Sequence, residues 1–91
     1  MTRDNFVKML VDKTAIAAER WECFIDCPSF YAFSAHDNNG ELFLGEFLDN
    51  EFYIYKADDK QIANDPQAVY HSPYWYNYLT KTLVTSGKLV P

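Results

Sequence analysis

The chain has few of the residues that build covalent cross-links, phosphate-binding loops or membrane spans. Its two cysteines, Cys23 and Cys27, cannot supply a disulfide framework, and its three glycines are too scattered to cradle a phosphate. No apolar run approaches the length that crosses a bilayer, and the polar, charged N-terminus does not resemble a cleavable signal. We therefore expect a single α+β domain over residues 1–91 in a reducing, cytoplasmic setting.

Acidic residues are absent from the last part of the chain, which makes the charge distribution uneven. The net charge is −5, yet residues 37–65 hold eight acidic and two basic residues, whereas residues 66–91 hold two lysines and no acid. An acidic region repels the phosphates of nucleic acids and suits a basic partner. The sequence therefore predicts no direct nucleic-acid binding and no membrane association.

Aromatic residues, by contrast, make up 18% of the chain and are dense in its central part. Short runs of aromatic and β-branched residues separated by turn residues predict antiparallel strands. Asn39-Gly40 favours a type I′ turn, with positive φ at both central residues, and Asp49-Asn50 is a weaker signal of the same kind. The expected strands cover residues 30–36, 41–48 and 51–57.

The two faces of this meander differ in character, because alternate residues of a strand point to opposite faces. In the second strand, Leu42 and Leu44 point one way while Phe43 and Phe47 point the other. We expect the aliphatic face to take the helices, and the aromatic face to need a helix, a second copy of the chain or a partner. Gly45 lies in mid-strand, which indicates a bulge or a close backbone approach.

A helix is expected before the meander. Thr2 can cap it, and an apolar stripe at helical spacing runs as far as Trp21. We place its end near Cys23, because Pro28 disfavours helical geometry at the residue before it. The alternative is that residues 21–27 form a short edge strand.

A second helix is expected after the meander. Ser72-Pro73 has the pattern of a cap followed by the first helical residue, and Gly87 favours a helix end. The predicted helix covers residues 73–86. The predicted fold is thus α-β-β-β-α, a three-stranded antiparallel meander packed with an N-terminal and a C-terminal helix.

Groups that could carry chemistry are few and poorly spaced. Cys23 and Cys27 could bind a metal together with both histidines, yet their spacing matches no usual zinc ligand pair. Ser34 and His36 share a strand face, but their Cα atoms would lie about 7 Å apart, too far for direct activation of the serine. We therefore predict no catalytic residue, no metal and no cofactor. A small enzyme with a site near His36 and His71 is kept as an alternative.

Binding to another protein is the function that the remaining features favour. The aromatic residues of segment 70–78 cannot all lie on one inward stripe of a helix, and tyrosine and tryptophan are frequent interface anchors. We predict a small acidic, non-enzymatic module that docks on a larger basic protein. The expected partner-binding residues are Asp37, Glu41, Glu46, Asp49, Glu51, Tyr53, Tyr55, Asp58, Asp59, Tyr74 and Tyr76.

Two further forms of this hypothesis follow from the same composition. One is an inhibitor that mimics nucleic acid by presenting carboxylates where a partner expects phosphates; small phage-encoded inhibitors of host defence resemble the chain in size and charge. The other is a homo-oligomeric structural or accessory protein whose aromatic sheet face is covered by its own copy. Alternatively, the large rings simply fill a thin core.

Overall fold

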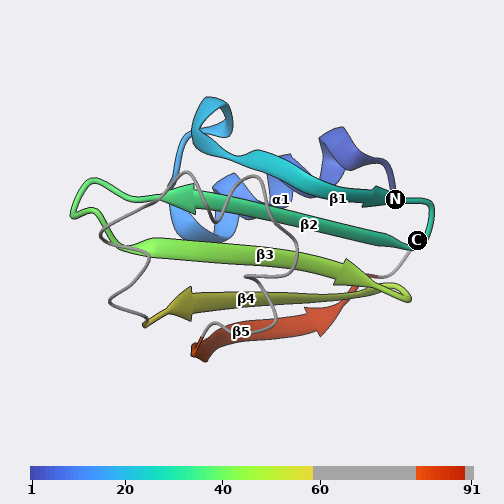
Figure 1. The fold of residues 1–91 in the computed structure, drawn as a ribbon. Helices are drawn as coiled ribbons and strands as arrows, with labels where there is room; N and C mark the ends of the chain where they lie inside the picture. Colours follow the sequence, from blue (N-terminus) through green and yellow to red (C-terminus); the bar gives the residue numbers. More distant parts are fainter. Residues whose placement is uncertain (59–79, 90–91) are drawn as a thin grey trace.

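An antiparallel sheet with a helix on one face is formed by residues 1–58 and 80–89, which are the residues that the computed structural model describes (Figure 1). The described sheet has five strands in the order β1-β2-β3-β4-β5, so each strand pairs with its neighbour in the chain. No described helix is long and apolar enough to cross a membrane. The elements are α1 (Arg3–Thr14), the 3-10 helix η1 (Ala18–Arg20), β1 (Glu22–Cys27), β2 (Phe30–His36), β3 (Leu42–Leu48), β4 (Glu51–Ala57) and β5 (Lys81–Lys88).

The central strands lie where the sequence predicts them. The predicted fold class is wrong, because strands and not helices flank them in the sheet. The three expected strands correspond to β2, β3 and β4. Two further strands, β1 and β5, extend the sheet at its edges, so the meander has five strands in the described residues rather than three. Strand β5 occupies chain that was predicted to be helical as far as Ser86, and β1 begins within the last residues of the predicted first helix.

Helix α1 begins where predicted and ends early. The Thr2 side chain accepts a hydrogen bond from the Asn5 N–H at 3.2 Å, as an N-cap should. The helix ends at Thr14 and not near Cys23, because Ala15 adopts the left-handed conformation with φ 59°. The predicted extension of the helix is therefore incorrect.

The early end of α1 allows the following segment to join the core. Ile16 lies six residues after Leu10, so in a continuous helix it would point roughly 120° away from Leu10. Outside the helix, Ile16 and Trp21 are both buried, and the Trp21 indole N–H donates to the Ile16 carbonyl at 3.3 Å. The chain then pairs with β2 as β1, which makes the edge-strand alternative the correct one.

The C-terminal helix predicted over residues 73–86 is wrong wherever the structure describes it, and residues 73–79 lie outside the described part. Lys81–Lys88 pairs antiparallel with β4 as β5. Thr82, Val84 and Thr85 lie in this run, and β-branched residues favour strands over helices. Gly87 does not end a helix but lies opposite Phe52, where an added Cβ would be 2.7 Å from the Phe52 Cε1.

The two central hairpin turns are where the sequence predicts them, but only the second has the predicted type. Asp49 and Asn50 have φ of 49° and 65°, as a type I′ turn requires. In the first turn only Gly40 has positive φ, at 77°, and its N–H donates to the Asp37 carbonyl at 3.1 Å. That geometry is a type I turn followed by a left-handed glycine. The Asp37 carboxylate stabilises the turn by accepting from two backbone N–H groups of the loop, both at 2.9 Å.

Helix α1 packs on the phenylalanine face of the sheet, which reverses the predicted assignment of the faces. The centroid of the Phe6 ring lies 5.8 Å from the ring centroids of both Phe33 and Phe47. Leu10 packs directly against Gly45, where an added Cβ would lie 2.6 Å from the leucine Cδ2. Of the bulge and the close approach that the position of Gly45 indicated, the close approach is the one found. The core on this face contains Phe6, Leu10, Ile16, Trp21, Tyr31, Phe33, Ala35, Phe47, Phe52 and Ile54.

Replacing Gly45 with alanine is expected to lower the free energy of unfolding by about 1–3 kcal/mol, the usual cost of overpacking a core. Leu10 is fully buried, so a shift of its side chain disturbs the packing around it. Urea unfolding measures the loss. In a Leu10→Ala background, itself destabilised by about 2–5 kcal/mol, the same substitution should cost much less. An equal cost in both backgrounds would contradict the contact.

Replacing Ala15 with glycine is expected to stabilise the protein by about 1 kcal/mol, because a left-handed conformation strains any residue with a Cβ. Thermal unfolding measures the change. Ala18→Gly in η1 is the matched control: Ala18 does not have positive φ, so glycine there should only destabilise. A loss of stability in both variants would rule out strain at Ala15.

Candidate binding surface

The sheet face opposite α1 is divided into a buried half and a partly exposed half. On the side of β2, Ala32 and Ser34 are fully buried. On the side of β5, Tyr53 and Tyr55 are half-buried, and Leu83 remains 51% exposed. The exposed half is therefore the part of this face that another molecule can reach.

Side chains from three strands meet on this exposed half, and we call them the tyrosine patch. Strand register places Glu46 opposite Tyr53, and Tyr55 opposite Leu83. Residues opposite one another in an antiparallel sheet share a face and interact directly. The tyrosine patch comprises Glu46, Glu51, Tyr53, Tyr55, Lys81 and Leu83.

The two tyrosines form a pair of parallel plates along β4. Their ring centroids are 6.3 Å apart and the planes differ by 11°. Alternate residues of a strand are about 6.6 Å apart, so the spacing follows from the strand itself. The Tyr53 hydroxyl donates a hydrogen bond to the Glu51 Oε2. This bond to a carboxylate is the main reason why the pKa of Tyr53 is raised, and it keeps the phenol protonated.

A lysine from β5 completes the patch on the side of Tyr55. The Lys81 Nζ lies 4.9 Å from the centre of the Tyr55 ring and 3.7 Å from the Glu46 Oε1. The Glu46 side chain is only 13% exposed, and burial raises its pKa while Lys81 lowers it. Burial also raises the pKa of Tyr55, and the charge of Glu46 adds to that effect. Lys81 therefore compensates a carboxylate that is largely removed from water.

The other predicted partner-binding residues do not join the patch. Glu41 forms an ion pair with Lys56 at 2.8 Å, and Asp37 stabilises the β2–β3 turn. Asp37 and Asp58 adjoin one end of the β3–β4 pair, whereas Asp49 lies in the turn at the other end. The carboxylates of this region are thus distributed over both ends of the sheet. Three predicted residues lie outside the described residues: Asp59, Tyr74 and Tyr76.

Sequence reasoning found four members of the patch and missed two. Glu46 and Glu51 were predicted as acidic residues of segment 37–65, and Tyr53 and Tyr55 as aromatic residues that strand alternation places on one face. Lys81 and Leu83 were missed, because they were assigned to a helix. The threonine- and valine-rich composition of residues 80–86 is the signal that could have identified them as part of a strand.

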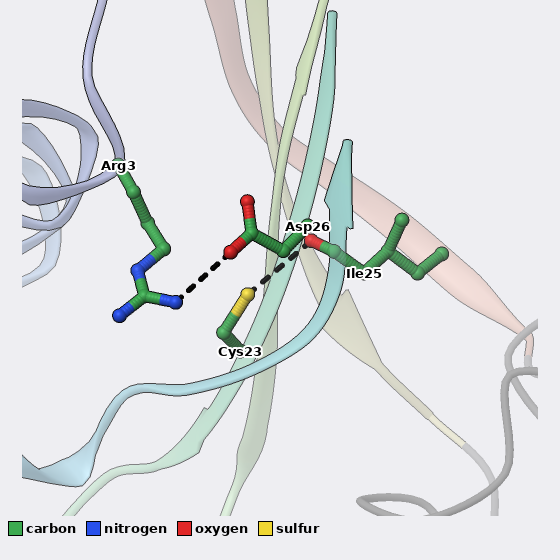
Figure 2. A network of polar contacts seen from close by, with 4 residues as sticks. All are labelled: Arg3, Cys23, Ile25 and Asp26. Atoms are coloured by element: carbon green, nitrogen blue, oxygen red, sulfur yellow. Dashed lines mark hydrogen bonds and ion pairs between the residues drawn. The ribbon is translucent and has the colours of Figure 1, made fainter. Parts of the chain in front are cut away.

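A separate polar network ties α1 to the β1 edge of the sheet (Figure 2). The Arg3 guanidinium donates to the Asp26 carboxylate at 3.0 Å. Across the β-bulge of β1, the Cys23 thiol donates to the Ile25 carbonyl at 3.3 Å. Burial raises the pKa of the Cys23 thiol, and the charge of Asp26 raises it further. The thiol is therefore a poor nucleophile, and the network is structural.

The metal and serine groupings weighed from the sequence are not assembled in the described residues. Cys23 pairs with Phe33 on the α1 face, whereas Cys27 pairs with Phe30 on the opposite face. Within residues 1–58 and 80–89, no three His, Cys, Asp or Glu side chains are placed to hold a metal ion. Ser34 is fully buried, and His71 lies outside the described residues.

Comparison with known proteins found no relative of this chain. No family model matches it, and no match was found among curated proteins or solved structures.

Replacing Lys81 with methionine is expected to raise the pKa of Glu46 further, because Lys81 is the group that opposes the effect of burial. An NMR titration of the side-chain carboxyl measures the pKa. Lys56→Met, which removes the partner of Glu41, is the matched control and should leave Glu46 unchanged. A pKa of Glu46 that is the same with and without Lys81 would contradict the ion pair.

The same substitution should change how stability depends on pH. A carboxyl whose pKa is higher in the folded chain favours folding most below its unfolded pKa, and this contribution is lost as pH rises through the folded pKa. The Lys81→Met variant should therefore lose more stability than the wild type as pH rises above the ordinary glutamate pKa of 4.5. Urea unfolding at several pH values measures the difference.

Proposed function

We propose that this chain is a small, non-enzymatic protein-binding module that docks on a larger protein through the tyrosine patch. The observation that carries the proposal is the pair of parallel, half-buried rings of Tyr53 and Tyr55 beside the exposed Leu83. Tyrosines offer large contact areas with little loss of side-chain freedom, and they often dominate binding energy. A patch that combines them with hydrogen-bonding groups is suited to a protein surface.

The charge of the chain supports a basic partner. The net charge is −5, and Glu51 adds a carboxylate to the patch that no described lysine or arginine neutralises. Complementary charge speeds association and selects among partners. The proposal includes no direct nucleic-acid contact, and it assumes a reducing compartment such as the cytoplasm, in which Cys23 and Cys27 stay free thiols.

Mimicry of nucleic acid receives less support than docking through tyrosines. A mimic needs a row of unpaired carboxylates, whereas Glu41 and Glu46 each have a lysine partner. The aspartates of this region lie toward both ends of the β3–β4 pair. We therefore propose a basic protein surface as the partner without requiring that it bind nucleic acid.

A second candidate function is self-association along β5. Val84 is 54% exposed on this strand, and among the described strands β5 pairs only with β4. However, lysines at both ends and a β-bulge within the strand are features that discourage edge-to-edge pairing. Self-association therefore ranks second.

The test uses the full chain as bait in an extract of the cells that produce it. The wild type is expected to capture a basic protein that a Tyr53→Ala/Tyr55→Ala variant no longer captures. With the purified partner, calorimetry should give at least about tenfold weaker binding for this variant, as for interface hot spots. Asp12→Ala, an exposed substitution on α1, is the control and should bind normally.

Two results would contradict the proposal. The first is partner binding that survives the loss of both tyrosines. The second is an affinity that does not fall when salt screens the charges. Light scattering tests the second candidate: a dimer that dissociates on Val84→Lys would favour self-association over a separate partner.

A further inference from the structure

The tyrosine patch already contains one cation site, occupied by the chain's own lysine. Lys81 lies over the ring of Tyr55 and beside the carboxylate of Glu46, at 4.9 Å from the ring centre and 3.7 Å from the carboxylate. A tyrosine face and a carboxylate together attract a cation, through the ring quadrupole and through charge. A second site with the same two groups should therefore also bind a cation.

A second tyrosine–carboxylate pair lies next to the first. Tyr53 and Glu51 are adjacent on the same face of β4, and the Tyr53 hydroxyl donates to Glu51. Within the described residues, no lysine or arginine lies over the Tyr53 ring or forms an ion pair with Glu51. Lys88 is opposite Glu51 in the strand register, yet no ion pair joins these two residues.

We propose that Tyr53 and Glu51 form a binding site for an arginine side chain of the partner protein. The guanidinium lies against the Tyr53 ring and donates hydrogen bonds to the Glu51 carboxylate. This inference rests on the proposed function and specifies the chemistry that the partner contributes to the interface.

Arginine fits this site better than lysine. A guanidinium is planar, so its face can stack on a ring while its N–H groups donate to a carboxylate that lies in the plane of the guanidinium. The Tyr53 hydroxyl occupies only one position on Glu51, and a carboxylate can accept about four hydrogen bonds. Capacity for a forked arginine contact therefore remains.

The site is held in place before any partner arrives. The hydroxyl of Tyr53 orients Glu51, and the ring of Tyr55 lies parallel to that of Tyr53. Tyr55 is in turn held by Lys81, whose charge is compensated by Glu46 and so does not repel an incoming cation strongly. A preordered site loses less conformational freedom on binding.

The experiment is an NMR titration of the isotope-labelled full chain with Nα-acetyl-arginine methylamide, a minimal arginine side chain. Saturable shifts are expected at the Tyr53 ring and the Glu51 carboxyl. The lysine analogue should bind more weakly, and the citrulline analogue, which has the same shape without the charge, should not bind. Sodium chloride at matched ionic strength controls for screening.

Substitutions then locate the site. Glu51→Gln and Tyr53→Leu should each weaken binding of the arginine probe roughly tenfold, which is one step on the affinity scale. Glu41→Gln is the matched carboxylate control, because Glu41 is paired with Lys56 elsewhere on the sheet, and it should leave the affinity unchanged. If Tyr53→Leu fails to fold, Tyr53→Phe, which keeps the ring and loses the hydroxyl, should bind with intermediate affinity.

Two results would overturn the arginine site. One is a set of NMR shifts that spreads evenly over the carboxylates, and the other is an affinity for the arginine probe that Glu51→Gln does not change. Its failure can be told from failure of the proposed function. If the probe does not bind but Tyr53→Ala/Tyr55→Ala still abolishes partner binding, the arginine site is wrong and docking through the patch stands. If partner binding ignores both tyrosines, the proposed function itself fails.

Discussion

The contact between Leu10 and Gly45 determines how the two faces of the sheet are used. Leu10 reaches the backbone of β3 only because Gly45 has no side chain, and this approach brings Phe6 into contact with Phe33 and Phe47. The helix thereby covers the phenylalanine face, where large rings bury the most apolar area. Strand alternation then leaves the tyrosines of β4 on the opposite face.

The last strand, β5, supplies the charged residue that orders the side chains of this opposite face. Glu46 is mostly buried, and a buried carboxylate is tolerated when a cation lies beside it. Lys81 supplies the cation from β5 and also lies over the Tyr55 ring. Lys81 therefore both compensates the charge of Glu46 and holds the ring of Tyr55 in place. Binding through this surface would use side chains that are already ordered.

Three local signals were reliable, each where a residue's own chemistry favours one backbone arrangement. The cap at Thr2, the left-handed turn at Asp49-Asn50 and the close approach at Gly45 were all predicted from residue type. The first turn was predicted at the right place with the wrong type, because a type I turn followed by a left-handed glycine also accommodates Asn39-Gly40. The helix signals at Trp21 and Gly87 were misleading, because they reflect local preference and not the strand pairing that the sheet offers.

The sequence by itself determined the three central strands, the positions of their turns and the alternation that places Tyr53 and Tyr55 on one face. Only the tertiary structure decided that the chain leaves the helix at Ala15, that β5 pairs with β4, and that Lys81 joins the tyrosine patch. The physical reason is that turns and alternation depend on neighbouring residues. Edge-strand pairing and helix docking depend instead on contacts between segments far apart in the chain, which local preference does not encode.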